Sequence, residues 1–125
     1  MLHLNMDDLS KLRANTRCET FRTLRLIASE AEQLDYQKKV PIAHVSDELF
    51  CSWEACYQDL KDLDWYQKIF SEHELQILAQ FDVTFEIVCS ETDEIVPYIT
   101  DFIKTKQWVT LSNAAKLALS ELSAT

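Results

Sequence analysis

Glycine is absent from all 125 residues of this sequence, and that absence limits the fold more than any other feature. Glycine supplies the positive φ angles of tight hairpin turns and the close backbone approach of phosphate-binding loops. A Rossmann fingerprint or a P-loop therefore cannot be written in this chain. Because there are also only two prolines, the composition favours α-helices joined by short polar turns.

Residues 71–91 carry the clearest helix signal in the chain. Ser71 and Glu74 have the spacing of a capping box, in which each side chain pairs with the backbone amide of the other residue. Most apolar residues beyond this start fall on one side of the helix, but Val83 and Ile87 fall on the opposite side. A helix that is apolar on both flanks is expected to be packed on both. We therefore predict a compact bundle of about five helices around this central hydrophobic helix.

A long amphipathic pattern before this segment predicts the first helix. It begins at Asp7 or the next residue, since acidic residues suit a helix N-terminus, and runs to about Tyr36. Ser29 and Gln33 fall on its polar face. Residues 1–6 show only a weak alternation of apolar residues and are interpreted as an extended or disordered arm.

Helix-start signals predict the remaining helices. Ser46 is expected to cap a second helix, and Pro97 belongs in the first turn of a later one, where its missing amide hydrogen is not needed. Thr110 or Ser112 is expected to cap the last helix. The whole chain is thus predicted to be all-α, and its length suits a single helical domain covering residues 1–125.

The negative charge is concentrated in the middle of the chain. Residues 41–103 hold two Lys or Arg against fourteen Asp or Glu, while the formal net charge of the whole chain is −9. Such a surface repels nucleic acid and anionic lipid, so neither is expected as a partner. It either keeps the protein soluble or steers a basic protein partner towards it. The carboxylates expected to contact such a partner are Asp47, Glu48, Glu54, Asp59, Asp62 and Asp64.

Arg13 and Arg17 lie one turn apart near the apolar side of the first helix. Their methylene stems are able to follow a hydrophobic surface while the guanidinium groups reach water. Alternatively, they pair with carboxylates from the acidic middle of the chain, within one molecule or across a dimer, or they hold an anion. Both arginines are therefore kept as candidate partner-binding residues.

A set of aromatic residues at helical spacing has two interpretations. The first is core packing, which is the usual role of an aromatic stripe. The second is a small-molecule pocket, because amphipathic aromatic side chains present a ring to a cavity and a polar tip to its mouth. The residues of this alternative ligand pocket are Trp53, Tyr57, Phe81 and Phe85.

No pattern in the sequence favours catalysis. The cysteines at positions 18, 51, 56 and 89 form no CxxC pair, and no histidine is placed by its context beside a thiol. Acidic residues three apart, at 59 and 62 and again at 91 and 94, leave a metal-dependent helical hydrolase as the residual enzyme hypothesis. We expect no enzyme, no cofactor and no bound metal.

The remaining function class is protein binding. The first hypothesis is a non-enzymatic interaction module that forms a homodimer through leftover apolar surface. The alternatives are an acidic inhibitor, of the antitoxin or immunity type, and a small-molecule-binding helical domain. We expect the protein in the cytoplasm, since the start of the chain runs directly into two aspartates and no long apolar span follows.

Overall fold

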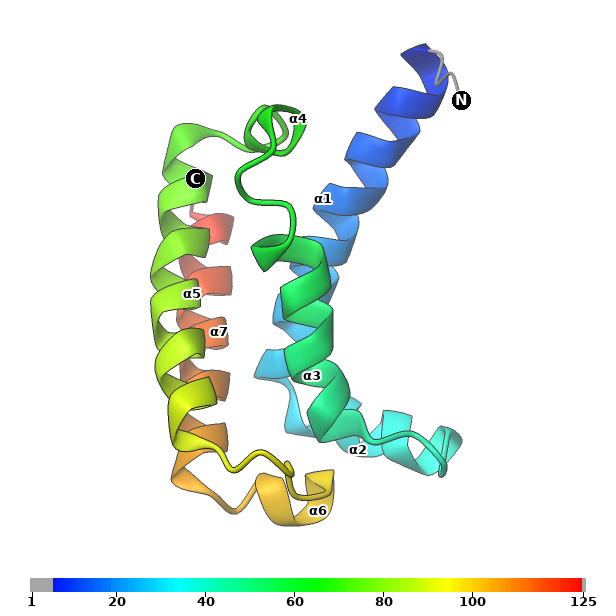
Figure 1. Cartoon of the computed structure of the whole chain (residues 1–125), viewed down its shortest axis with the longest axis vertical. Coiled ribbons are helices and arrows are strands. Elements are labelled where there is room, and N and C mark those ends of the chain that lie inside the picture. Colours follow the sequence, from blue (N-terminus) through cyan, green and yellow to red (C-terminus); the bar gives the residue numbers. More distant parts are fainter. Residues whose placement is uncertain (1–5, 125) are drawn as a thin grey trace.

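The computed structural model describes residues 6–124 and is all-α, as predicted, with no strand among those residues (Figure 1). Residues 1–5 of the predicted arm lie outside the described residues, and Met6 begins the first helix. The helices are α1 (Met6–Ala28), α2 (Glu30–Lys39), α3 (Val45–Trp53), the π-helix η1 (Glu54–Gln58), α4 (Asp64–Gln67), α5 (Glu72–Glu91), α6 (Ile99–Phe102) and α7 (Lys106–Ser123).

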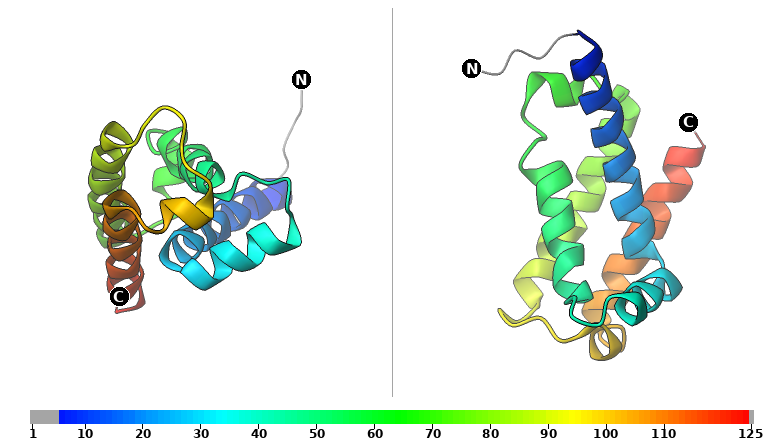
Figure 2. Two further views of the ribbon diagram at one scale, coloured as in Figure 1. Left: turned by 90° about the horizontal axis from the view of Figure 1, so that it is seen from below. Right: turned by 90° about the vertical axis from the view of Figure 1, so that its right-hand side faces the viewer.

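The long helices form two layers. α5 and α7 lie side by side in one layer, and α1 and α3 lie in the other (Figures 1 and 2). α2 and α6 lie across one end of the bundle (Figure 1). The core between the layers contains the fully buried side chains of Leu24, Trp53, Leu78, Phe85 and Leu111.

The predicted first helix is wrong in one respect, because it breaks at Ser29. This residue has extended backbone angles (φ −118°, ψ 104°), and its hydroxyl accepts a hydrogen bond from the Glu32 amide, so that it caps α2. Serine favours such N-cap positions because its hydroxyl satisfies an amide that has no partner inside the helix. The chain therefore turns at Ser29 instead of continuing as one rod.

Gln33, which we expected on a polar face, is fully buried. Its Nε2 donates to the carbonyls of Leu26 and Ile27 at 2.9 and 3.0 Å, and its Oε1 accepts from the indole N–H of Trp108 at 2.9 Å. The two carbonyls lie in the last turn of α1, where no intrahelical donor follows them. Gln33 thus closes the end of α1 and joins it to α7.

Three predicted helix starts are shifted. α3 is capped by His44, whose ring nitrogen Nδ1 accepts from the Asp47 amide, whereas Ser46 is buried and donates to the carbonyl of Pro97. Pro97 precedes α6 and does not lie in its first turn. The last helix begins earlier than predicted, because the Thr105 hydroxyl accepts from the amide of Trp108 at 3.1 Å.

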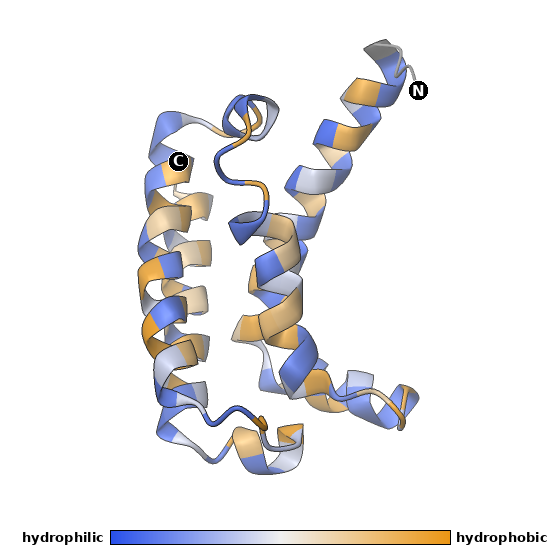
Figure 3. Ribbon diagram, in the orientation of Figure 1, coloured by the Kyte–Doolittle hydropathy of each residue, from blue (hydrophilic) through white to orange (hydrophobic). Residues whose placement is uncertain are grey.

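α5 begins as predicted but is covered on one flank only. The Ser71 hydroxyl accepts from the Glu74 amide at 3.1 Å, and the Glu74 carboxylate accepts from the Ser71 amide at 2.9 Å, which completes the capping box. The inward face, with Leu78 and Phe85, is buried. Val83 and Ile87 are exposed, so the expected packing of both flanks is wrong. Apolar colour accordingly reaches the outward edge of α5 in Figure 3.

Candidate interaction surfaces

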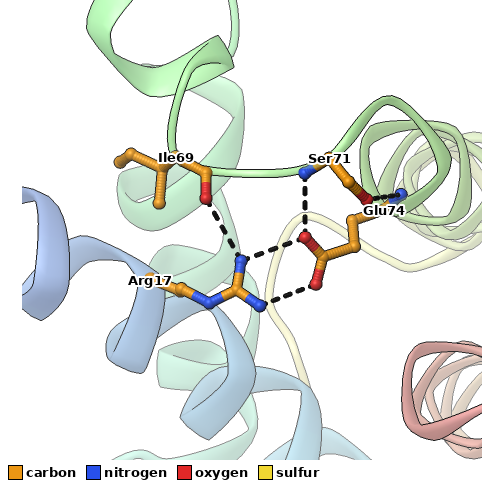
Figure 4. Close-up of polar contacts among 4 residues, drawn as sticks. All are labelled: Arg17, Ile69, Ser71 and Glu74. Carbon is orange, nitrogen blue, oxygen red and sulfur yellow. Dashed lines mark hydrogen bonds and ion pairs between the residues drawn. The ribbon is translucent and has the colours of Figure 1, made fainter. Parts of the chain in front are cut away.

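Arg17 is held by a carboxylate of the same chain. Its Nη1 and Nη2 lie 3.1 and 2.7 Å from the two carboxylate oxygens of Glu74, and Nη1 also donates to the Ile69 carbonyl at 3.2 Å (Figure 4). The guanidinium lies 4.8 Å from the ring centroid of Phe21 and 5.2 Å from that of Phe70. The pairing considered for this arginine is thus found within one molecule, where it joins α1 to the start of α5.

This pair keeps both of its groups charged. Hydrogen bonds from Arg17 lower the pKa of the Glu74 carboxyl below its ordinary value of 4.5, and the Ser71 amide adds to the effect, although burial opposes it. The same contact raises the pKa of Arg17. Nη1 and Nη2 of Arg17 both donate within the chain, and the role of Arg17 in partner binding stays a prediction.

Arg13 has a different environment from Arg17. Its side chain is half-buried, and its Nε is buried without a hydrogen-bond partner in the part of the chain that the structure describes. No ion pair of Arg13 is found among residues 6–124. Its role in partner binding stays a prediction.

The four aromatic residues of the alternative ligand pocket pack on one another in the core. The ring centroids of Trp53 and Tyr57 lie 4.7 Å apart in a stacked pair, and Phe81 meets Trp53 edge-on, also at 4.7 Å. Phe85 lies 6.3 Å from both Trp53 and Phe81. The rings therefore fill the space that a ligand would need to occupy.

Asp82 accepts a hydrogen bond from the indole N–H of Trp53 in this aromatic group. Its Oδ1 accepts from the Trp53 indole N–H and from Nε2 of Gln58, each at 2.9 Å, and Nζ of Lys61 lies 3.9 Å from its other oxygen. A buried indole N–H without an acceptor would cost free energy. The burial of Tyr57 near Asp82 raises the pKa of its phenol to about 12, so this hydroxyl stays protonated at neutral pH.

The six candidate carboxylates do not form one patch. Glu48 accepts from the Tyr36 hydroxyl, a contact that raises the pKa of that phenol, so Glu48 serves to join α3 to α2. Three further exposed carboxylates do not line the hollow described next: Asp59 and Asp62 in the turn between η1 and α4, and Asp64 at the start of α4.

Asp47 and Glu54, the other two candidates, lie together at a hollow of about 220 Å³. Asp93 and Glu94, from the turn after α5, line the same hollow. Its remaining lining is mainly apolar and consists of Phe50, Cys89, Thr92 and Val96. The structure therefore brings two of the predicted carboxylates to two others that were not among the candidates.

A surface that sequence reasoning missed covers the outward side of α5 and α7. Four large apolar side chains of these two helices are exposed: Val83 (62%), Ile87 (50%), Val109 (46%) and Leu117 (60%). No other element of residues 6–124 lies over this side of the layer (Figure 2). We call these four residues the outer face. Val83 and Ile87 were recognised in the sequence as the second apolar flank of this helix, but they were expected to be buried.

Between α5 and α7 this outer face is hollowed. The groove has a volume of about 230 Å³, and small side chains of α7 open it. It is lined by Ile77, Gln80, Phe81, Thr84, Ala114, Leu117, Ala118 and Glu121. Leu117 therefore belongs both to the groove and to the outer face.

Three of the cysteine thiols, those of Cys51, Cys56 and Cys89, have raised pKa values. Burial raises the pKa of Cys56 and of Cys89 to about 11, and the pKa of Cys51 is raised by burial and by the neighbouring carboxylate of Asp47. A thiol with a raised pKa is a poor nucleophile at neutral pH. Among the described residues, no group of three or more His, Cys, Asp or Glu side chains is placed to hold a metal ion.

The chain matches no protein-family model, no curated protein and no solved structure. Within residues 6–124, each helix is too short or too polar to span a lipid bilayer. Function must therefore be inferred from the surfaces described above.

Proposed function

We propose that this protein is a non-enzymatic protein-interaction module that forms a homodimer through the outer face of α5 and α7. The observation that supports this proposal is that two neighbouring helices each expose two large apolar side chains, Val83 and Ile87 on α5 and Val109 and Leu117 on α7. Single exposed apolar residues are ordinary on protein surfaces, whereas a contiguous group of them marks an interaction site.

The geometry of this face suits association with a second copy. α5 and α7 are antiparallel neighbours that present a broad surface, and no other described element lies over it (Figures 1 and 2). Burial of apolar surface stabilises a complex by roughly 25 cal/mol for each Å² removed from water. This surface carries both exposed side chains and a groove. In a two-fold dimer, the side chains of each copy enter the groove of the other.

Sedimentation equilibrium of the wild-type chain and of two lysine variants tests this proposal. Ile87→Lys places a charge on the outer face and is expected to convert the dimer to a monomer. Ile42→Lys is the matched control, since Ile42 is 97% exposed in the loop between α2 and α3. It is expected to leave the dimer intact. A wild-type chain that is monomeric at every accessible concentration would exclude the homodimer.

A second candidate function is the binding of a basic protein partner, and one observation favours it. Asp47, Glu54, Asp93 and Glu94 surround a hollow whose floor includes Phe50 and other apolar groups. A lysine or arginine side chain has both matching parts, an apolar stem for the floor and a cationic head for the carboxylates. This surface lies between α3 and the start of η1 on one side and the end of α5 with the turn that follows it on the other.

Titration with a short lysine- and arginine-rich peptide, followed by amide NMR, tests this second candidate. The amides around Asp47 and Glu54 are expected to shift, and binding is expected to weaken steeply with added salt. The double variant Asp47→Asn/Glu54→Gln should lose the response. The control Asp62→Asn/Asp64→Asn changes two exposed carboxylates elsewhere and should retain it. Equal loss in both variants would indicate attraction to the net charge alone.

The third hypothesis, a small-molecule site, has less support. The rings of Trp53, Tyr57, Phe81 and Phe85 are buried against one another, and Trp53 is fixed by Asp82. A ligand would have to displace these side chains from the core.

A further inference from the structure

We propose that the second copy packs with its α7 against α5 of the first, so that Glu91 of each chain lies against the partner's Lys106. The two-fold axis of this arrangement runs parallel to α5 and α7. The inference rests on the proposed homodimer, and it adds which helices meet and which charges pair. It follows from three features of the outer face: its shape, its exposed charges and the position of two of these charges at helix ends.

The shape of the groove sets the level at which the helices meet. Gln80 and Thr84 of α5 line the same groove as Ala114 and Leu117 of α7, so these parts of the two helices are at the same height. Val83 lies between Gln80 and Thr84 in the sequence and is exposed. Rotation about a two-fold axis parallel to α5 and α7 leaves the position of every residue along that axis unchanged. It therefore brings Val83 to the partner's Leu117.

The exposed charges favour α5 against α7 over α5 against α5. The exposed carboxylates at the ends of α5 are Glu72 and Glu91, whereas α7 exposes Lys106 and Lys116. A dimer that pairs α5 with the partner's α5 places carboxylates on both sides of the contact. Pairing α5 with the partner's α7 places Glu91 opposite the partner's Lys106, and such pairing of opposite charges is the arrangement that complementary interfaces show.

Glu91 and Lys106 also oppose the dipoles of their own helices. Glu91 is the last residue of α5, where a negative charge is unfavourable, and Lys106 is the first residue of α7, where a positive charge is unfavourable. Neither side chain forms an ion pair among residues 6–124. Within residues 6–124, these two charges thus form no ion pair that would offset their unfavourable interaction with the helix dipoles. In the proposed dimer they would pair with each other.

The connection between the two helices places these charges at one end of the molecule. The C-terminus of α5 and the N-terminus of α7 both lie at the end that α6 covers (Figure 1). Because the proposed axis keeps each end of the molecule next to the same end of its partner, Glu91 meets the partner's Lys106 there. The symmetry repeats this contact, so each dimer contains two such pairs.

Charge reversal tests the pairing. Glu91→Lys and Lys106→Glu are each expected to raise the dimer dissociation constant about tenfold. Each substitution replaces two attractive surface ion pairs of the dimer by two repulsive contacts. The double variant restores opposite charges and is expected to return to within about threefold of the wild type. Glu91→Lys also lowers the net negative charge, so a general charge effect would tighten the dimer instead.

The stability of the monomer provides a second readout of the same variants. Each reversal improves the match between charge and helix dipole, so thermal unfolding of the diluted monomer should shift upward while dimerisation weakens. A merely structural role for these side chains would move both quantities in the same direction. Parallel loss of monomer stability and of dimer affinity would therefore overturn the proposed pairing.

Disulfide trapping distinguishes this inference from the proposed function. Val83→Cys and Leu117→Cys are made separately in a chain that also carries Cys18→Ser and Cys51→Ser, which removes two exposed native thiols. Mixing the two variants should give a cross-linked heterodimer, and Val83→Cys alone should give none. Cross-linking of Val83→Cys with itself would show a dimer built on α5 against α5 and overturn the inference. A chain that sediments only as a monomer would overturn the proposed function with it.

Discussion

Arg17 on α1 and Glu74 on α5 form an ion pair with two hydrogen bonds, and the same Glu74 carboxylate completes the capping box of α5. One oxygen of Glu74 accepts from both the Arg17 guanidinium and the Ser71 amide, so the same carboxylate starts α5 and ties it to α1. The two residues are 57 positions apart in the sequence. This contact accounts for an arginine beside the apolar face of α1.

Replacing Arg17 by methionine is expected to destabilise the fold by about 1 to 3 kcal/mol. The expected loss is below that of a fully buried pair because the guanidinium is partly exposed to solvent. Urea unfolding measures the change. Arg22→Met is the matched control, since the pair of Arg22 with Glu19 is exposed and should contribute less than about 0.5 kcal/mol. Equal effects of the two substitutions would contradict this account.

Glu74 predicts an acid-dependent loss of stability. Its pKa is lower in the folded protein than in the unfolded chain, so its contribution is complete above the ordinary value of 4.5 and is lost as the pH falls through the folded value. Glu74→Gln should flatten this part of the pH dependence of the free energy of unfolding. Urea unfolding at a series of acidic pH values measures the slope. An unchanged slope in the variant would show that other groups cause the acid sensitivity.

Gln33→Leu is expected to cost about 2 to 3 kcal/mol, because it leaves the indole N–H of Trp108 and the Ile27 carbonyl without a partner. The Leu26 carbonyl keeps only its bond from the Ser29 amide. Trp108→Phe removes only the indole N–H from the same network. A double-mutant cycle on the free energy of unfolding should show clear coupling between the two positions. Additive effects would mean that the hydrogen bond contributes little.

These findings separate what local sequence determines from what it leaves open. The absence of glycine and the capping box at Ser71 are local features, and both led to correct predictions of helix type and of the start of α5. The break at Ser29 was missed because serine is compatible with both a polar helix face and an N-cap. Gln33 was missed because its partner Trp108 lies 75 residues away.

The candidate surfaces were harder to predict than the helices. Helical periodicity identified Val83 and Ile87 as apolar, but it did not tell whether another helix covers them. In the same way, charge counting identified an acidic segment without showing that Asp47 and Glu54 meet Asp93 and Glu94 at one hollow. Both features depend on how elements distant in the sequence are packed.

A methyl NMR dilution series tests the homodimer through the outer face most directly. The Ile87 methyl resonances should move as the wild-type protein is diluted, because this side chain leaves an apolar contact for water. The methyl resonances of Ile42 and Ile95, which are 97% and 86% exposed away from this face, should stay in place and serve as internal controls. Concentration-independent Ile87 resonances, or equal movement of all three, would contradict an interface on the outer face.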